Sequence, residues 1–544
     1  GPVVQAAGSY LPPQGGWYPR SGRGRITYEI AVTVPEAQRA LATGRKTGSE
    51  SVEGRSRASF AADYPSEGPA VFAGSYNETS RTLDGVTLRT LFPAGHDGGA
   101  ELAESYLDST ARYLRHYQAV VGPYPYPAFS VVAAPFPVGL GFEGATYVSE
   151  RILDLPYMQG RSLAHEILHS WWGGAVGIAS EEGNWAEGLT TYLADHWVVA
   201  ERDLAAAEEL RRQWLRDFAA LPDSRRQPLT AFTGKLHDAA QVTGYNKAAM
   251  LFHMLRSRVD LQTFEAALAG FYDANRFETA SWADLRTAFE AAAGTDLDRF
   301  FEQWLTRPGA PTLRIASAER KHTADGWSIA LGLAQSESEY ALQVPVEVAT
   351  EAGTARVTVP LERRQTNTVI QLDAKPTALS IDPHADVFRE LSGDQVPLSL
   401  RHLTLDPATR VVALGVPEAA ALQLAGSLLD TEAKTLGADA AASGSAPLLA
   451  IGTPDRLAGL LERTGFGPPP SEVAGRGTLR AWTAEADGRR ALFVSADDPD
   501  SLTGATRRLG YYLRESWLVV DGREIAARGT WPTGPDPLRV EFGG

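Results

Sequence analysis

The segment His165-Glu166-Ile167-Leu168-His169 constrains the fold more than any other part of this 544-residue chain. Residues four apart on an α-helix project from the same face, about one turn apart, so the two imidazoles of a helical segment can bind one metal ion. Glu166 then points at a water on that ion. The motif therefore predicts a helix that carries a metal site with its own base. The alternatives are a chance match and a pair of buried structural histidines.

The third ligand is expected on the next helix. Because the chain has no cysteine, a catalytic metal must be held by His, Asp or Glu, and two histidines with one glutamate are a known zinc set. Glu187 opens the next predicted helix, and Gly173-Gly174 can end the first helix so that the chain turns back. We therefore predict one Zn²⁺ bound by Glu187 and the two histidines. Glu181 and Glu182, in the expected connecting loop, are rival ligands.

Composition excludes several classes of protein. Hydrophobic residues make up 44% and charged residues 22% of the chain, which is ordinary for a folded globular protein with several domains. A net charge of −15 argues against nucleic acid or anionic lipid as a partner. The lack of cysteine excludes disulfide scaffolds, cysteine nucleophiles and iron–sulfur clusters. With no run of about 18 apolar residues, no integral membrane segment is expected.

The sequence pattern predicts a multidomain α+β protein with four parts. Short alternating runs between glycines and prolines indicate a β domain over 1–94. Apolar residues at helical spacing predict a mostly helical catalytic domain over 95–309. Closely spaced short strands predict a β-sandwich over 310–400, and interleaved strand and helix signals predict an α/β accessory domain over 401–544.

Within the accessory domain we expect helices over 418–437 and 500–513 and a flexible loop over 438–446. Its turns contain neither GxGxxG nor GxxxxGK[ST], so no nucleotide site is predicted. This domain could bind a protein or a surface, but no motif in its sequence identifies a ligand.

Around the metal motif the sequence resembles the M1 family of gluzincin metallopeptidases, which carry HExxH followed by Glu on the next helix. Further segments resemble those of the family: Val121–Pro127, Gly244–Leu251 and Phe300–Leu305. The resemblance covers roughly residues 20–400 and implies a thermolysin-like catalytic domain with one Zn²⁺. It also implies that residues 1–94 form a partial N-terminal β domain, because the family's domain is longer. The loop between the ligand helices is one residue shorter than in the family pattern.

Tyr245 is the predicted donor to the oxyanion. Peptide hydrolysis places negative charge on the former carbonyl oxygen in the transition state, and a phenol hydroxyl opposite the metal would stabilise it. In the resembled family the Tyr of a Tyr-x-Lys-Gly helix supplies this donor. Tyr245 and Lys247 match the motif, with Ala248 in place of the Gly. The alternative is that Tyr245 is an aromatic core residue.

The segment Leu140–Gly144 aligns with the family's exopeptidase motif Gly-x-Met-Glu-Asn, so Gly141, Phe142 and Glu143 are predicted to bind substrate. In the family the Glu of this motif binds the free α-amine. Here that Glu is kept, whereas the first Gly, the Met and the Asn are replaced. The alternative is that Glu143 is an exposed strand carboxylate.

These residues together predict a zinc metallopeptidase for a peptide or protein substrate, with Glu166 as general base and M1-like aminopeptidase activity as the first expectation. Three alternatives remain: a zinc endo- or oligopeptidase with the same site, a zinc hydrolase of a non-peptide substrate, and a non-catalytic M1-like scaffold that binds a protein partner. The opening Gly1-Pro2 suggests a trimmed start, so we expect an exported protein, periplasmic or extracellular, although this chain carries no signal peptide.

Overall fold

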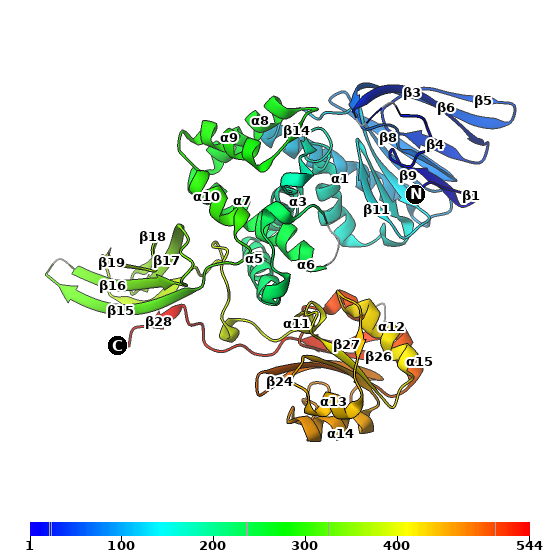
Figure 1. Ribbon diagram of the computed structural model, residues 1–544. Helices are drawn as coiled ribbons and strands as arrows, with labels where there is room; N and C mark the ends of the chain where they lie inside the picture. Colours follow the sequence, from blue (N-terminus) through cyan, green and yellow to red (C-terminus); the bar gives the residue numbers. More distant parts are fainter. Residues whose placement is uncertain (21, 23, 235–237, 325, 506–507, 544) are drawn as a thin grey trace. The chain divides into compact units, whose positions relative to one another are not determined.

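The computed structural model describes residues 1–20, 22, 24–234, 238–324, 326–505 and 508–543. The chain falls into two compact units, one of residues 1–207 and 255–301 and one of residues 208–254 and 302–544. Both units contain helices and sheets (Figure 1), which confirms the predicted multidomain α+β class. Among the described residues, no helix combines the length and the apolar character that crossing a membrane requires.

The first unit opens with two small antiparallel sheets. One has the strand order β1 (Val3–Gln5), β2 (Gly8–Leu11), β7 (Val71–Gly74) and β4 (Arg39–Ala42). The other has the order β3 (Ile26–Pro35), β6 (Arg55–Ser66) and β5 (Arg45–Val52). Along β3 exposed and half-buried side chains alternate, as the period of two in its sequence predicts.

A five-stranded mixed sheet follows in the same unit. Its order is β11 (Gly139–Phe142), β12 (Ala145–Ser149), β10 (Ala128–Ala134), β9 (Val86–Pro93) and β8 (Tyr76–Leu83). The central strand β10 is buried along its whole length and runs parallel to both neighbours, as expected for a strand covered on both faces. Strands that precede residue 94 thus share a sheet with strands that follow it.

The helices of this unit position the metal motif. They are α1 (Gly99–Val120), α2 (Leu163–Leu168), α3 (Ala186–Thr190), α4 (Trp197–Arg202), α8 (Leu261–Asn275) and α9 (Trp282–Ala293). The π-helical segments η2 (Met158–Ser162) and η4 (Thr191–His196) directly precede α2 and follow α3. Tyr106, Tyr113 and Tyr117 line the buried face of α1, in agreement with their helical spacing. Short strands β13 (Gly177–Ile178) and β14 (Thr279–Ala280) pair in parallel.

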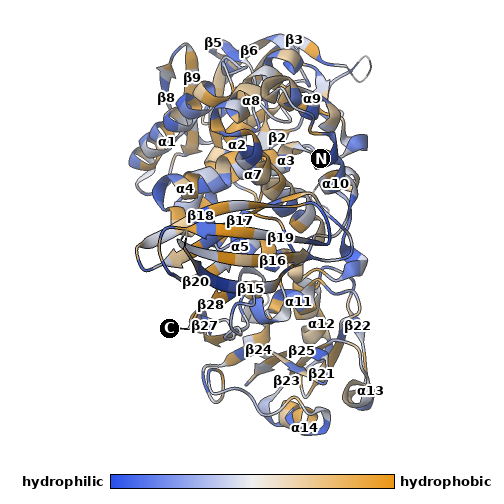
Figure 2. Cartoon of the chain, turned by 90° about the vertical axis from the view of Figure 1, so that its left-hand side faces the viewer, coloured by the Kyte–Doolittle hydropathy of each residue, from blue (hydrophilic) through white to orange (hydrophobic). Residues whose placement is uncertain are grey.

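The second unit contains a β-sandwich and an α/β domain. The sandwich has one sheet of β15 (Leu313–Thr323), β16 (Gly326–Gln335) and β19 (Gln365–Leu372) and one of β18 (Gly353–Leu361), β17 (Leu342–Thr350), β20 (Pro376–Ile381) and β28 (Arg539–Glu541). Hydrophobic and hydrophilic residues both colour its strands (Figure 2), and along β17 buried side chains alternate with more exposed ones at Leu342–Val348, which places one face of that strand in the core.

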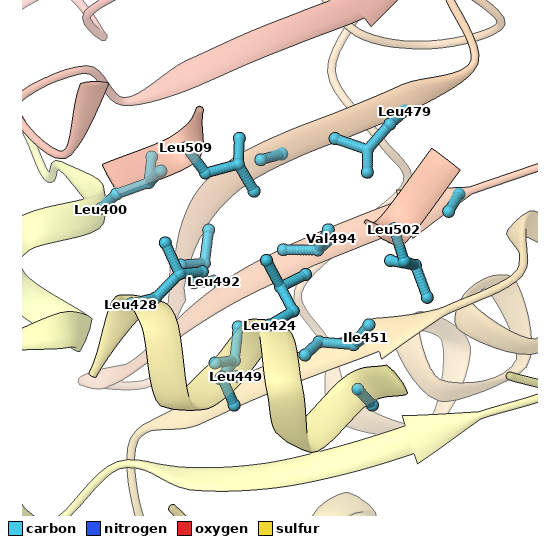
Figure 3. Close-up of a cluster of buried hydrophobic side chains, with 14 of the residues drawn as sticks. Leu400, Leu424, Leu428, Leu449, Ile451, Leu479, Leu492, Val494, Leu502 and Leu509 are labelled. Carbon is cyan, nitrogen blue, oxygen red and sulfur yellow. The ribbon is translucent and has the colours of Figure 1, made fainter. Parts of the chain in front are cut away.

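The α/β domain is built on a seven-stranded sheet. Its order is β22 (Lys434–Thr435), β21 (Arg410–Leu414), β23 (Leu448–Gly452), β25 (Arg489–Ala496), β24 (Leu479–Ala486), β26 (Trp517–Asp521) and β27 (Glu524–Gly529). Two hydrophobic clusters lie on its opposite faces. One packs α11 (Leu400–Thr404), α12 (Glu418–Leu428), α15 (Pro499–Ala505) and the turn η9 (Leu509–Tyr512) on the sheet (Figure 3), and the other packs α13 (Ala438–Ser443) and α14 (Pro454–Thr464).

Three details differ from expectation. The helix predicted over 418–437 ends at Leu428, because Leu429 is extended. The segment predicted as a flexible loop over 438–446 contains α13, whose Ala441 is fully buried; alanine has the highest helix propensity, and packing of this face stabilises the short helix. The other expected helix, 500–513, is shorter, since α15 ends at Ala505 and a 3₁₀ turn occupies Leu509–Tyr512, with residues 506–507 outside the described part.

The chain also returns to the sandwich after the α/β domain. Its last strand, β28, pairs with β20 at Ala378–Ser380. The predicted accessory domain over 401–544 therefore contains a strand that belongs to the sheet of the preceding part.

Candidate metal centre

His165 and His169 lie one turn apart at α2, and Glu187 lies in the first turn of α3. The Nε2 atoms of the two imidazoles are 3.1 Å apart. Glu187 Oε2 lies 3.6 Å from His165 Nε2 and 3.4 Å from His169 Nε2. Within the described part of the chain, these are the residues whose ligand atoms, all within 4.8 Å of one another, could hold a metal ion.

These separations fit a zinc ion. Ligands placed tetrahedrally at about 2.0–2.1 Å from zinc lie roughly 3.3 Å from one another, close to the three distances above. Glu187 Oε2 is buried, and among the described residues its polar neighbours are the two imidazoles, at distances longer than a good hydrogen bond, so its bonding capacity is incompletely used. Two imidazoles and a carboxylate are also donors that Zn²⁺ accepts. The residues present therefore fit the predicted cofactor.

Neighbouring acceptors orient the two imidazoles. Asp195 Oδ2 lies 3.3 Å from His165 Nδ1, and the Trp172 carbonyl oxygen lies 2.9 Å from His169 Nδ1. An acceptor at Nδ1 favours the tautomer that carries its proton there, which leaves Nε2 able to bind a metal. Asp195 belongs to η4, which continues α3, so one helical stretch carries both a ligand and the residue that orients another ligand.

Two glycines let the chain turn sharply after α2. Gly173 has a φ of 92°, in the left-handed region that favours glycine. A Cβ on Gly174 would lie 2.7 Å from the carbonyl oxygen of His169 and 2.8 Å from that of Ser170, so a larger residue does not fit. This turn brings the Trp172 carbonyl back to the His169 ring.

The charges in the cluster favour an ionised carboxylate. Burial alone would raise the pKa of Glu187, but the adjacent His169 and His165 outweigh it and hold the pKa of this carboxyl well below its usual range. Burial would likewise lower the pKa of His165, yet the carboxylates of Asp195 and Glu187 raise it. In the metal-free chain the ionised carboxylate therefore pairs with the imidazoles, and a metal ion that binds here would release their Nε2 protons.

The edge strand β11 passes next to Glu166. β11 is the outermost strand of the five-stranded sheet. A Cβ added to Gly141 would lie 2.8 Å from Glu166 Oε2, so glycine at this position leaves room for the predicted base. An outer strand of this kind can pair with an extended peptide through backbone hydrogen bonds.

Phe142 lies on the other face of β11, because successive residues of a strand point to opposite sides. Its ring packs edge-on against Tyr10 and Phe72, with centroid distances of 5.8 and 5.3 Å. The structure thus brings Gly141 to the predicted base and places Phe142 in an aromatic cluster with β2 and β7. Roles for both residues in substrate binding stay predictions.

Glu143 contacts the N-terminal β region. Its carboxylate accepts hydrogen bonds from Ser66 Oγ at 2.5 Å and from the Glu67 backbone N–H at 3.0 Å, and it lies 3.9 Å from the Arg25 guanidinium. Only 9% of Glu143 is exposed, so the alternative of an exposed strand carboxylate is wrong. Burial raises the pKa of Glu143 to about 7, although these hydrogen bonds act in the opposite direction.

Tyr245 lies in the second unit, within the π-helical segment η7 (Val242–Lys247). η7 continues α6 (Asp238–Gln241) into α7 (Ala248–Val259). The Tyr245 ring contacts Phe232 edge-on at 6.0 Å, and a Cβ on Gly244 would lie 2.1 Å from the Phe232 ring. Close packing on Gly244 thus fixes the segment around Tyr245. The role of its hydroxyl stays a prediction.

Asp195 is the candidate residue that the sequence analysis missed. A usable signal was present, because a metal-bound histidine normally donates its second N–H to a carboxylate or carbonyl. Asp195 follows Glu187 by two helical turns and is an acidic residue on the ligand helix. The role of the Trp172 carbonyl could not be predicted in this way, because every residue has a backbone carbonyl whatever its side chain.

Comparison with known proteins agrees with this geometry. Residues 106–304 match the family described as Peptidase family M1 domain. Aminopeptidase M1 of Arabidopsis thaliana is 26% identical over 253 residues, which are 43% of this chain and 28% of that protein. Aminopeptidase M1-A of Oryza sativa subsp. japonica is 23% identical over 278 residues, which are 46% of this chain and 30% of that protein. The chain thus spans less than a third of the length of these relatives.

A solved structure shows the same fold. The crystal structure of Legionella pneumophila aminopeptidase A in complex with aspartic acid superposes with a TM-score of 0.59 and 16% sequence identity, covering 74% of this chain and 49% of that one. The family match includes both ligand helices and Tyr245, so the resemblance seen in the sequence is confirmed. Over residues 106–304 this chain is therefore similar to the domain of peptidase family M1.

Proposed function

We propose that this chain is a zinc-dependent peptidase and acts as an aminopeptidase. The observation that carries the proposal is the meeting of His165, His169 and Glu187, with donor atoms within 4.8 Å, inside an M1 peptidase domain. The relatives named as aminopeptidases support the exopeptidase part.

Each residue around the metal centre has a separate role in the proposed hydrolysis. Zn²⁺, when bound, would act as a Lewis acid that polarises the scissile carbonyl and acidifies an attacking water. The Glu166 carboxylate takes the proton of that water and delivers it to the leaving amine. Glu166 Oε2 is next to Gly141, so a peptide paired with β11 would run beside the base. Asp195 keeps the proton of His165 on Nδ1.

We assign Tyr245 the donor role for the oxyanion. Its match to the family motif and the close packing of η7 around Gly244 support this assignment. A phenol held in place can donate its O–H to a developing negative charge without reorganisation, which is where such a donor contributes most.

Glu143 is the candidate for binding the substrate amine. A buried carboxyl whose pKa is raised to about 7 is only partly ionised at neutral pH, and an arriving ammonium group would favour its ionised form. One observation favours the second candidate, an endo- or oligopeptidase: both carboxylate oxygens of Glu143 already accept hydrogen bonds, from Ser66 and Glu67.

Cleavage-site mapping tests the proposal. Matched peptides with free and acetylated amino termini are incubated with the full chain, with and without a chelator, and the products are identified by mass spectrometry. We expect stepwise loss of amino-terminal residues from free peptides, abolished by the chelator and restored by Zn²⁺. Equal internal cleavage of both peptide sets would favour the endopeptidase. Chelator-resistant cleavage, or none at all after zinc loading, would contradict a zinc peptidase.

A further inference from the structure

The helix that carries Tyr245 is capped at its N-terminus by a carboxylate from the α/β domain. α6, η7 and α7 run without a break from Asp238, and the first N–H groups of a helix need acceptors outside it. Asp430 supplies them: its Oδ1 accepts from the Asp238 N–H at 2.7 Å and its Oδ2 from the Ala239 N–H at 3.4 Å. Asp430 lies 192 residues further along the chain than Asp238.

Asp430 itself is firmly held. Its side chain is 7% exposed and forms an ion pair with Arg225, and its backbone N–H donates to the Thr404 carbonyl at 2.9 Å. It follows α12, which Leu424 and Leu428 fix to the sheet (Figure 3). A carboxylate with this many fixed contacts is a rigid anchor for the start of the helix.

A second link reaches the residue next to Tyr245. Asn246 donates from Nδ2 to Asp217 Oδ2 at 3.1 Å. Asp217, 1% exposed on α5 (Leu204–Ala219), also accepts two hydrogen bonds from Arg514 of the α/β domain, from Nε at 3.1 Å and from the terminal nitrogen at 2.7 Å. Such a two-pronged pair between arginine and carboxylate fixes direction as well as distance.

We propose that the C-terminal α/β domain is a positioning element for Tyr245, acting through Asp430 at the start of its helix and through Arg514 and Asp217 at Asn246. The inference rests on the proposed catalytic role of Tyr245. The two links lie on either side of Tyr245, one at the start of its helix and one at Asn246 within the π-helical turn. Such π turns inside helices are frequent at functional sites. Because a displacement of about 1 Å can cost roughly 10²-fold in rate, anchors at this turn can matter for turnover.

Hydrogen exchange tests the structural half in the full-length chain. We expect Asp430→Ala to speed amide exchange over residues 238–250. The matched control is Asp497→Ala, which removes another Asp–Arg pair of the same domain, with Arg480, and should leave that segment unchanged. Equal protection of residues 238–250 in Asp430→Ala and in the parent protein would overturn the inference.

A double-mutant cycle tests the catalytic half. We expect Asp430→Ala to lower kcat by about 10-fold or more with KM nearly unchanged, and Asp430→Asn, which keeps one acceptor oxygen, to lose less. In a Tyr245→Phe background, Asp430→Ala should cause no further loss, because its effect runs through the phenol.

The outcomes separate this inference from the proposed function. If Tyr245→Phe lowers kcat and Asp430→Ala lowers it by the same factor in both backgrounds, Asp430 does not act through Tyr245 and the inference fails while the proposed function stands. If Tyr245→Phe leaves kcat unchanged, the proposed role of Tyr245 fails, and the catalytic half of the inference fails with it. Thermal unfolding of each variant identifies a loss of activity that comes from global unfolding.

Discussion

Asp195 Oδ2 and His165 Nδ1 lie 3.3 Å apart, so the helical stretch that supplies Glu187 also sets the orientation of a histidine on the other helix. The two halves of the metal motif are thereby coupled without the ion. The geometry of the centre is built into the fold around it, which is what tight metal binding requires.

Loss of the Asp195 carboxylate should weaken metal binding. Asp195→Asn removes the charge that favours the Nδ1 proton of His165, and we expect zinc affinity to fall by about 10- to 100-fold. Competition with a chelator of known affinity measures the change. Asp154→Asn is a matched control, since Asp154 also pairs with a histidine, His96, away from the centre. Unchanged affinity in Asp195→Asn would show that the contact is incidental.

A methyl group at Gly141 should disturb the base and spare the metal. The added Cβ would lie 2.8 Å from Glu166 Oε2, closer than non-bonded atoms allow. For Gly141→Ala we expect kcat to fall by about 10-fold or more with zinc content unchanged. Gly139→Ala lies on the same strand, where a Cβ meets no atom within 4 Å, and should keep normal turnover. Normal turnover in both variants would argue against β11 lying over the base.

Removal of the Tyr245 hydroxyl should act on turnover. If this hydroxyl stabilises the oxyanion, Tyr245→Phe lowers kcat by roughly 10²-fold and changes KM little, as expected for an interaction made in the transition state. Steady-state kinetics on one peptide substrate measures both constants. Tyr511→Phe, at a tyrosine that is 85% exposed, is the control. A normal kcat in Tyr245→Phe would contradict the oxyanion role and indicate that Tyr245 only packs in the core.

Glu143 should make stability depend on pH. Its pKa is raised from 4.5 to about 7 in the folded chain, so between these values the folded state holds more protons than the unfolded state. The free energy of unfolding then falls as pH rises from 4.5 to 7. Relative to Glu143→Gln, the parent protein should lose about 1–3 kcal/mol across this window.

Urea unfolding at pH 5 and pH 8 measures this loss. Glu36, an exposed residue of the same unit, provides the control. The difference in unfolding free energy between Glu36→Gln and the parent protein should be the same at both pH values. A constant difference between the parent protein and Glu143→Gln at both pH values would mean that Glu143 is ionised throughout.

Local patterns predicted most elements of this fold, because period and turn residues report directly on secondary structure. The β domain predicted over 1–94 contains strands such as β3, and the α/β domain predicted over 401–544 contains strands such as β23. The pairing of strands distant in sequence could not be predicted. Nothing in the sequence of β28 indicates that it pairs with β20. Likewise, β8 and β9 share their sheet with strands that follow α1. Such pairings depend on tertiary packing that a local pattern does not contain.

For the candidate site, too, the sequence predicts local features and misses contacts between distant segments. The ligand side chains follow from residue types at helical spacing, whereas the contacts of Glu143 with Ser66 and Glu67 join segments 76 or more residues apart. Asp430 is a similar case, since a capping carboxylate remote in sequence from its helix has no local signature.

Zinc content and peptide hydrolysis measured together on Glu166→Gln test the central claim most directly. Glutamine keeps the shape of the side chain but cannot take the proton of water, and Glu166 is not one of the three metal ligands. We expect about one zinc per chain, as in the parent protein, and hydrolysis reduced by several orders of magnitude. Full hydrolysis by the zinc-loaded variant would contradict the assignment of Glu166 as the base of a zinc peptidase.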